Sequence, residues 1–365
     1  MLGGAVMATA MCSCAGTTPR SRVTHEAPQR SEPALVALLA NRRLVEVGVA
    51  SGKVLARGRV GAGAPIAAAT GAYIAAPPSR KTLFVLVPYA PGKKQDIREV
   101  AVSDLTTVRS YRLPEGVVFR SLQAGRDGKH LYVVGNRGDA KQIRAPVLVV
   151  IDTASGRLLA RQTLRPADGR QWLVFDTALS SDGTLLAVSY HGPDTTGADW
   201  IRLKALTERC ADTTSLGVAC LSLHGDIAFR GGDIVATTGE GPLVERTLHD
   251  ELVRSWPVKL PRNHLTRLAL DAGAKRAAVI GGCDYTGGLS VISLLTGATT
   301  VIGYPEKVCG EEVVFVDRRT VAVARNALSV PQGTPSRIDL VDVQRRLIER
   351  HISIASDAVD LVAIG

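Results

Sequence analysis

The chain has 365 residues, of which 45% are hydrophobic and 21% charged, with 36 Gly and 18 Pro. This composition excludes a disordered or collagen-like protein and indicates a globular chain, rich in turns, that can bury a core. The net charge is +10, but the basic residues are scattered singly and aromatic residues make up only 4%, which leaves few platforms for stacking bases. We therefore expect no nucleic-acid partner.

The N-terminal stretch MLGGAVMATAMCSCAGTTPRS is a short apolar run followed by small residues and two cysteines. It resembles the end of a bacterial lipoprotein signal peptide, in which a small residue precedes the cysteine that is lipidated. Cys14, which follows Ser13, fits this pattern better than Cys12, which follows Met11. The resemblance implies a signal segment at 1–14 and an extracytoplasmic protein, either lipid-anchored in the cell membrane or secreted. The alternative is a disordered cytosolic N-terminus, since no Lys or Arg precedes the apolar run.

Residues 15–33, AGTTPRSRVTHEAPQRSEP, are polar and contain proline. They have almost no apolar surface to bury, so they are predicted to be a flexible tether. The rest of the chain, 34–365, is predicted to be one domain. No later stretch reaches 18 uninterrupted apolar residues, so the only expected membrane contact is the lipid anchor.

From residue 34 onward, a unit of four short strands recurs. In the clearest copy, 122–164, the apolar runs LYVV and VLVVID precede the turn ASGR and an alternating fourth strand. Seven positions mark the turn between the third and fourth strands: Gly52, Leu105, Gly156, Glu208, Asp250, Gly297 and Gln344. Their average spacing of about 49 residues is typical of propeller blades and predicts seven blades.

The two ends of the domain complement each other. The segment 357–365, DAVDLVAIG, is an apolar strand with no neighbouring partner in the sequence, whereas the first unit, from residue 34, lacks its innermost strand. Pairing them leaves no unpaired sheet edge. We predict an all-β, seven-bladed β-propeller of four-stranded antiparallel blades, closed by the C-terminal strand joining the N-terminal blade, and a monomer.

The motifs DGKHLYVVGN and VLVVIDTASGRLLA resemble the YVTN-type repeat of WD40-like seven-bladed propellers. The resemblance covers most of 34–365. It implies the fold, but that family includes surface proteins, lactonases and dehydrogenase subunits, so no single function follows.

In such a propeller, the connections between second and third strands and those between blades leave on one face, around the central channel, where ligands usually bind. We name it the loop face. The segments predicted there are 89–96, 136–145, 165–172, 190–199, 238–241, 261–266, 282–288, 306–312 and 326–336. The candidate ligand-binding residues on this face are Arg137, Asp139, Trp172, His191, Asp194, Glu240, His264, Asp284, Tyr285 and Glu311.

Several of these residues have two readings. Asp284 is able to bind a cation or a cationic ligand, or else to cap its own backbone in an Asx turn. Trp172 is able to stack on a sugar or peptide, although packing between blades is the more frequent role. His191 and His264 are the two candidate general bases, but exposed loop histidines are usually only solvated and neither has a Ser or Cys nucleophile at motif spacing. Arg137 and Asp139 belong to an Arg-Gly-Asp tripeptide, which is read as a turn.

No metal or cofactor is predicted. The carboxylates of the loop face are spread over several blades, and the nearest approach to a cluster is Glu311 with Glu312, close to Cys309. The chain has no Walker loop, no GxGxxG after a strand, and no HExxH or GxSxG motif.

Four further cysteines have no CxxC spacing: Cys210, Cys220, Cys283 and Cys309. Zinc sites favour closely spaced ligand pairs, so disulfides are the preferred reading, in agreement with export. The blade pattern places Cys283 and Cys309 on the loop face of adjacent blades, and Cys210 and Cys220 around the outer region of blade 4, which makes these two pairs the predicted bridges. Four buried free thiols are the alternative.

These features favour a non-catalytic lipoprotein propeller that binds a protein, peptide or envelope polymer through the loop face. A second hypothesis is a propeller enzyme, a lactonase-like hydrolase or a lyase, with His191 or His264 as base and a metal held by loop-face carboxylates. A third is the large subunit of a quinoprotein amine dehydrogenase, which requires a small partner chain that carries the cofactor.

Overall fold

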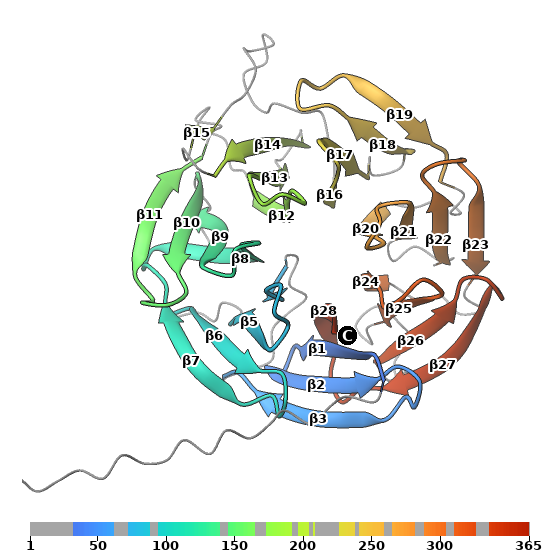
Figure 1. Ribbon diagram of the computed structural model, residues 1–365, viewed down its shortest axis with the longest axis horizontal. Helices are drawn as coiled ribbons and strands as arrows, with labels where there is room; N and C mark the ends of the chain where they lie inside the picture. The colour runs from blue at the N-terminus through green and yellow to red at the C-terminus, as the bar shows by residue number, and fades with distance from the viewer. Residues whose placement is uncertain are drawn as a thin grey trace, which may run out of the picture.

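The structure, a computed structural model, describes residues 32–61, 72–87, 94–138, 145–164, 173–191, 196–203, 207–208, 226–237, 241–258, 265–281, 288–303, 310–325 and 336–364. These residues form seven antiparallel sheets of four strands each and no helix. The sheets stand around a common axis like the blades of a propeller (Figure 1). Within the described part of the chain, no helix is long and apolar enough to cross a membrane.

The strands of each blade are given from the inside outward. Blade 1 contains β28 (Ala358–Ile364), β1 (Ala34–Leu39), β2 (Arg43–Gly48) and β3 (Val54–Arg59). Blade 2 contains β4 (Ile74–Ala75), β5 (Thr82–Leu86), β6 (Asp96–Ala101) and β7 (Thr107–Arg112). Blade 3 contains β8 (Val117–Ala124), β9 (His130–Arg137), β10 (Pro146–Asp152) and β11 (Leu158–Thr163). Blade 4 contains β12 (Leu173–Leu179), β13 (Leu185–His191), β14 (Thr196–Arg202) and β15 (Thr207–Glu208).

The remaining three blades follow the same order. Blade 5 contains β16 (Ile227–Arg230), β17 (Asp233–Ala236), β18 (Leu243–Arg246) and β19 (Leu252–Trp256). Blade 6 contains β20 (Leu265–Leu270), β21 (Arg276–Gly281), β22 (Gly288–Ser293) and β23 (Thr299–Gly303). Blade 7 contains β24 (Gly310–Phe315), β25 (Thr320–Arg325), β26 (Arg337–Asp342) and β27 (Leu347–Ser353).

The predicted ring closure is confirmed. Strand β28, made of residues from the C-terminal end, is the inner strand of blade 1 and pairs antiparallel with β1, with Ala34 opposite Ile364 and Leu38 opposite Asp360. The blue and red ends of the chain therefore meet in one sheet (Figure 1). With β28, blade 1 has four strands like each of the other six described blades.

Burial explains the sequence pattern of the strands. Strands in the middle of a blade are covered on both faces by neighbouring blades, so β1 is buried at every residue and β10 at all but its last. Outer strands have one face in solvent and alternate, as β3 does with the sequence VLARGR. Continuous apolar runs followed by alternating strands are therefore the signature of a blade read from inside to outside.

The turns between third and fourth strands lie where the sequence predicts them in most blades. Gly52, Gly156 and Gly297 have positive φ angles, and so do the non-glycine residues Leu105 and Asp250. Gln344 also lies in the turn between β26 and β27, where Arg346 has the positive φ. One predicted position is wrong, because Glu208 lies in β15 and not in the turn before it.

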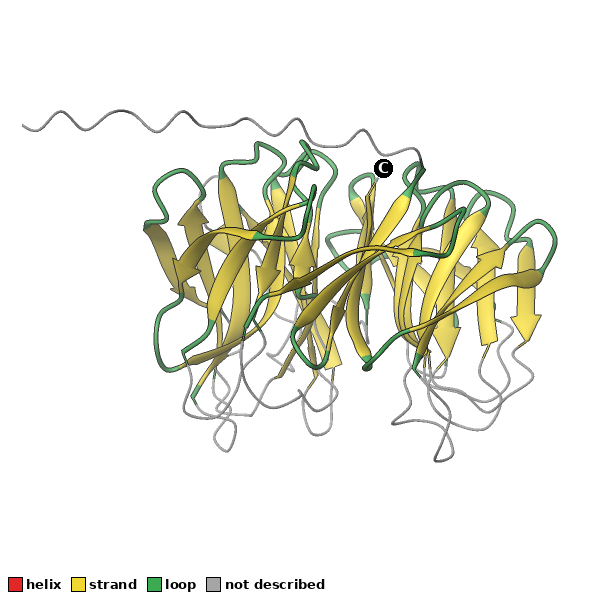
Figure 2. Cartoon of the chain, turned by 90° about the horizontal axis from the view of Figure 1, so that it is seen from below, coloured by secondary structure: helices red, strands yellow, loops and turns green. Residues whose placement is uncertain are grey.

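These turns and those between first and second strands lie on one face, which we name the turn face, and the loop face is opposite (Figure 2). The chain enters the ring on the turn face. There, Ser51 in the turn between β2 and β3 donates to Glu32 from its backbone N–H and its hydroxyl, at 2.8 and 2.6 Å, and Val49 N–H donates to Pro33 O at 2.9 Å.

Candidate functional site at the central channel

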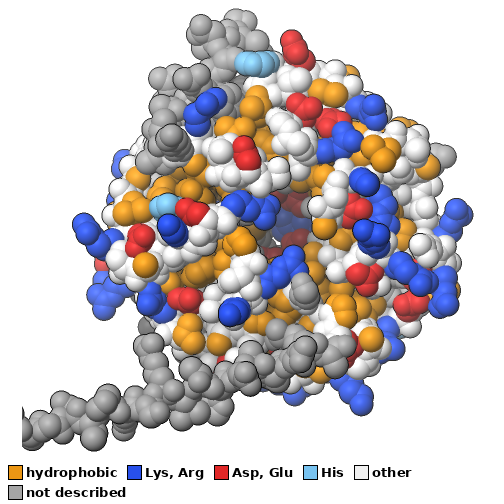
Figure 3. Space-filling model, in the orientation of Figure 1, with side chains coloured by type: hydrophobic (Ala, Val, Ile, Leu, Met, Phe, Trp, Pro, Cys, Tyr) orange, Lys and Arg blue, Asp and Glu red, His pale blue; other side chains and the backbone are white. Residues whose placement is uncertain are grey.

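The inner strands carry ionisable side chains close to their first residues. Asp226 immediately precedes β16, Arg267 lies in β20, Glu312 in β24, Asp360 in β28 and Asp176 in β12. We name these five residues the channel cluster. Basic and acidic side chains are visible in the hollow at the centre of the ring (Figure 3).

Arg267 is at the centre of the channel cluster. Its Nη1 donates to Asp226 Oδ1 at 3.0 Å, and its Nε lies 3.5 Å from Glu312 Oε2, so one guanidinium contacts acids from blades 5 and 7. Its guanidinium carbon is also 5.7 Å from the centroid of the Phe175 ring, on blade 4. The side chains of Arg267 and Asp226 are only 7% and 6% exposed, so the attraction between them is weakly screened by water.

Two other carboxylates accept hydrogen bonds from the next blade's backbone. Asp360 Oδ2 accepts from Tyr73 N–H at 2.5 Å and Ile74 N–H at 2.6 Å, at the inner strand of blade 2. Asp176 Oδ2 accepts from Ile227 N–H at 3.2 Å, at the inner strand of blade 5. These backbone groups have their partners in a neighbouring blade, because they lie at the ends of the ladder within their own sheet.

This pattern runs around the whole ring, with a polar link at every junction between adjacent blades. The links join Asp360 to Tyr73 and Ile74, Gln95 to Phe119, Asn136 to Val174, Asp176 to Ile227, Asp226 to Leu268, Arg267 to Glu312, and Ser336 to Asp357. The channel cluster thus supplies most of the links in the second half of the ring. Its first role is to fix the blades relative to one another.

Burial governs the protonation of the acids. It raises the pKa of Asp176 to about 8, with a further contribution from the charge of Asp226. It also raises the pKa of Asp360 to about 7, against the hydrogen bonds from Ile74 and Tyr73, and it raises the pKa of Glu312 well above its ordinary value. Arg267 stays charged, because the acids outweigh the effect of burial and raise its pKa.

The chemistry open to the cluster follows from these contacts. Arg267 is engaged by its acids, and Asp176 holds a proton near neutral pH, so the cluster is a charge-balanced structural network. Arg120, on β8, is outside the cluster, and its buried Nε has no hydrogen-bond partner among the residues that the structure describes. No group of three His, Cys, Asp or Glu side chains able to hold a metal occurs in the part of the chain that the structure describes.

The structure describes only three of the candidate residues that the sequence predicts on the loop face. Arg137 is the exposed last residue of β9, His191 is the last residue of β13, and Glu311 lies in β24. The side chains of His191 and Glu311 are outside the described set. The residues that lie wholly outside it are Asp139, Trp172, Asp194, Glu240, His264, Asp284, Tyr285, Cys12, Cys14, Cys210, Cys220, Cys283 and Cys309.

Several predicted loops are shorter than expected, since 136–145 begins inside β9, 306–312 ends inside β24, and 190–199 overlaps two strands. The segment 190–199 was expected to connect two strands, but Tyr190 and His191 belong to β13, and 196–199 belong to β14. The strand continues through Tyr190 to His191, and the glycine and proline that follow in the sequence mark its end. The connection is therefore confined to 192–195.

Sequence reasoning missed the channel cluster, although a signal was present. An ionisable residue stands near the start of the innermost strand in the motifs LVFDTAL, GDIAF, LTRLAL, GEEVVF and DAVDLV. A charge inside an otherwise apolar strand is costly unless it is paired, so its recurrence at the same place in successive blades indicates a shared network.

Comparisons with known proteins support the fold and show no function. No protein-family model and no curated protein sequence matches the chain. Among solved structures, it is similar to hydrazine synthase of Kuenenia stuttgartiensis, with a TM-score of 0.54 and 12% identity, covering 94% of this chain and 100% of that chain. It is also similar to a protein of unknown function from Bacteroides caccae, with a TM-score of 0.51 and 7% identity, covering 92% and 99% of the two chains. At identities this low, the structural similarity shows a common fold alone.

Proposed function

We propose that the chain is a non-catalytic β-propeller lipoprotein of the YVTN type, held outside the cytoplasmic membrane, that binds a protein, peptide or envelope polymer through its loop face. The observation that carries this proposal is the position of the chain's entry into the ring. Glu32 and Pro33 contact the turn between β2 and β3, on the turn face. An anchor attached through that end leaves the opposite face turned away from the membrane.

The two faces also differ in how their connections are built. On the turn face, connections are short and closed by their own backbone, as in Gly156 N–H to Asp152 O at 2.8 Å and Gly183 N–H to Ser180 O at 2.9 Å. On the loop face, the strand ends are separated by segments of unequal length and composition, such as 87–95 and 326–336. Variable segments on a ring fixed by links between all its blades are the usual arrangement of a recognition surface.

The binding role is tested by crosslinking in native cells followed by affinity purification. Wild type is compared with a triple variant, Arg137→Ala, Asp284→Ala and Tyr285→Ala, and with Arg57→Ala on outer strand β3 as the matched surface control. We expect one partner to be captured by wild type and by Arg57→Ala and to be lost from the triple variant. Equal capture by all three would exclude a role for these loop-face residues.

The anchor is tested by cell fractionation and mass spectrometry. Wild type is expected in the membrane fraction with a lipidated N-terminal Cys14, and Cys14→Ser is expected in the soluble fraction. Cys12→Ser is the matched control and should leave fractionation unchanged. An unprocessed chain in the cytosol would contradict export.

Export also predicts the state of the remaining cysteines. When the protein is denatured without reductant, Cys210, Cys220, Cys283 and Cys309 should resist alkylation, and all four should react after reduction. Labelling of all four without reductant would place the protein in a reducing compartment.

A further inference from the structure

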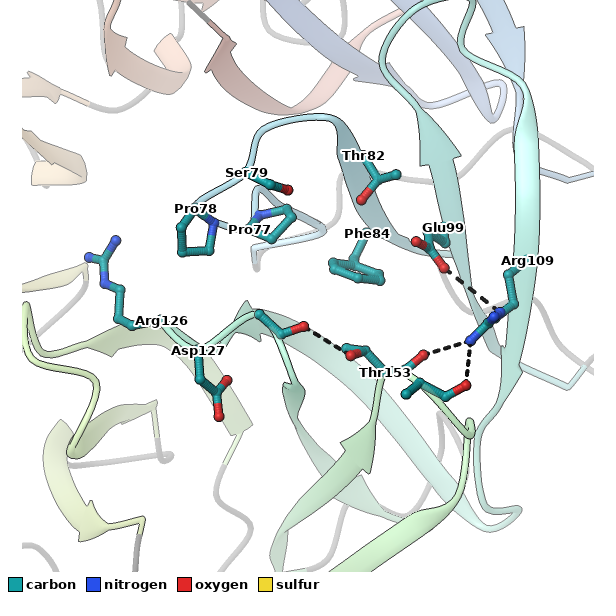
Figure 4. A pocket seen from close by; sticks show the side chains of 12 residues that line it. Pro77, Pro78, Ser79, Thr82, Phe84, Glu99, Arg109, Arg126, Asp127 and Thr153 are labelled. Atoms are coloured by element: carbon teal, nitrogen blue, oxygen red, sulfur yellow. Dashed lines mark hydrogen bonds and ion pairs between the residues drawn. The ribbon is translucent and has the colours of Figure 1, made fainter. Parts of the chain in front are cut away.

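A cavity of about 430 Å³ opens between blades 2 and 3 on the turn face, opposite the surface discussed above. One wall is the connection between β4 and β5, with Pro77, Pro78 and Ser79, and the other is formed by turns of blade 3 around Gly128 and Thr153 (Figure 4). Phe84, on β5, lies at the floor. The volume is within the range of small-molecule sites.

The walls are held in place without a ligand. Arg109, on β7, donates from Nη1 to Thr153 O and Ala154 O, both at 2.7 Å, and so ties blade 2 to blade 3 at the outer end of the cavity. Thr153 Oγ1 donates to Gly128 O at 2.9 Å, which joins the two turns of blade 3. A cavity whose walls are already ordered loses little conformational entropy on binding.

Four polar groups in this cavity are left for a ligand. Glu99 Oε2 accepts from the Tyr111 hydroxyl at 2.7 Å and lies 4.0 Å from Arg109 Nε, whereas Glu99 Oε1 has no hydrogen-bond or ion-pair partner among the described residues. The hydroxyls of Ser79 and Thr82 and the guanidinium of Arg126 also make no hydrogen bond or ion pair with the described residues. The set therefore offers a free carboxylate acceptor, two hydroxyls that both donate and accept, and a cationic donor.

The charges of the lining cancel. Arg109 and Arg126 are balanced by Glu99 and Asp127, so the side chains that line the cavity carry no net formal charge. The nearest comparison is a cavity of about 810 Å³ between blades 6 and 7, where Lys275, Arg276 and Arg318 outnumber Asp271 and Asp317. There, both Asp271 oxygens are already bonded within its own blade, and Asp317 Oδ1 accepts from Arg319 N–H and Thr320 N–H, which leaves Asp317 Oδ2 as the one carboxylate acceptor among three cationic side chains of the described lining.

We propose that the cavity between blades 2 and 3 binds an uncharged saccharide. A sugar ring presents an apolar C–H face, which fits the floor of Phe84 and the two prolines, and a rim of hydroxyls, which fits the acceptors and donors of Glu99, Ser79, Thr82 and Arg126. Glu99 accepts from sugar hydroxyls, and Arg126 donates to hydroxyl or ring oxygens. This site is separate from the loop face and does not depend on the function proposed for it.

The test is saturation-transfer difference NMR with the full chain and a fixed panel: glucose, galactose, mannose, N-acetylglucosamine, maltose, cellobiose and chitobiose. We expect at least one sugar to show transfer. Glu99→Gln keeps an acceptor for the Tyr111 hydroxyl but loses the charge, so it should weaken that sugar's binding about tenfold. Thr82→Val, which keeps the shape and removes the hydroxyl, should weaken it in the same direction.

Controls separate this site from others. Arg137→Ala on the loop face and Arg318→Ala at the cavity between blades 6 and 7 should bind the sugar as wild type does, and thermal melting verifies that each variant is folded. The proposal is overturned if no sugar of the panel shows transfer, or if Glu99→Gln and Thr82→Val both bind as wild type. Loss of binding in Arg318→Ala with retention in Glu99→Gln would overturn it in favour of the other cavity.

Discussion

Arg267 is the residue with the largest expected influence on stability. It is 7% exposed and contacts Asp226 and Glu312, on the two blades next to its own. Charges this far from water are tolerated because each has a partner, so removing one partner leaves the others without compensation. Protonation partly relieves the cost of leaving Asp226 and Glu312 unpaired, because the raised pKa values of these acids let them take up protons.

We predict that Arg267→Leu lowers the free energy of unfolding by about 3–5 kcal/mol at pH 8. The loss should be smaller at pH 5, where Asp226 and Glu312 are more readily protonated. Urea denaturation at the two pH values measures both effects. Arg57→Leu, an exposed change on β3, should stay within about 0.5 kcal/mol of wild type, and a similar loss in both variants would contradict a special role for Arg267.

The raised pKa values of Asp176 and Asp360 predict how stability depends on pH. Burial raises the pKa of Asp176 from its ordinary value of 3.8 to about 8 and that of Asp360 to about 7, so the folded protein binds these protons more tightly than the unfolded chain does. Their contribution is complete below about pH 4 and is lost as pH rises through the folded pKa values, which makes stability fall between pH 5 and 8. Asp176→Asn removes one titrating group and can still accept from Ile227 N–H. Its denaturation midpoint should fall less across this interval than that of wild type, and parallel curves would show that Asp176 titrates normally.

At the scale of single strands, shifts in strand register lie next to the residues of the channel cluster. The register between first and second strands shifts between Val174 and Asp176 in blade 4, and between Gly310 and Glu312 in blade 7. Blade 3 has the same shift, between Phe119 and Ser121. One extra residue in the inner strand re-aims the side chains next to it. The irregularity thus recurs beside the ionisable residues.

Gly135, on β9, is predicted to be required at the bulge of blade 3. A Cβ there would lie 2.3 Å from Val118 O and 2.5 Å from Phe119 Cα, and backbone atoms of a paired strand cannot move aside easily. Gly135→Ala should lower the free energy of unfolding by about 1–3 kcal/mol in urea denaturation. Gly232→Ala is the matched control, because no atom lies within 4 Å of the added Cβ. Equal stability of the two variants would show that β8 can shift.

The strands could be predicted where their hydrophobic pattern is visible within a short stretch of sequence. Blade 3 could be read from LYVV, VLVVID and ASGR, because burial on both faces and then on one face leaves a direct trace in the sequence. Glu208 was misplaced because β15 has only two residues and no alternation to read. The partners of Arg267 could not be predicted, since Asp226 and Glu312 are distant in sequence and meet only through the rotation from blade to blade.

At the scale of the molecule, closure of the ring depends on β28. It buries Ala358, Val359 and Leu361 against its neighbours and brings Asp360 to the N–H groups of Tyr73 and Ile74. Closure therefore joins blade 7, blade 1 and blade 2 at once. Among the described strands, no other combines a sheet partner so distant in sequence with a link to the next blade.

We predict that deleting 357–365 unfolds the protein cooperatively. The deletion exposes the inner edge of β1, opens the apolar interior of blade 1 and leaves Tyr73 and Ile74 N–H without acceptors. Circular dichroism should show loss of the β signal, or a melting temperature many degrees lower. Deletion of 1–31, which leaves Glu32 and Pro33 in place, is the control and should melt as wild type does. Unchanged melting after loss of 357–365 would refute closure by β28.

The pairing of β1 with β28 also sets the order in which the molecule is able to assemble as it is made. Strand β1 emerges first, but its partner emerges only after all other blades have been synthesised. Until then, the inner edge of β1 has unpaired backbone groups that can pair with a strand of another chain. Unpaired strand edges of this kind promote misassembly of nascent chains. If the chain crosses the membrane, a translocation route that carries unfolded polypeptide keeps blade 1 from forming before β28 has been synthesised. The whole ring then closes in a single event after translocation.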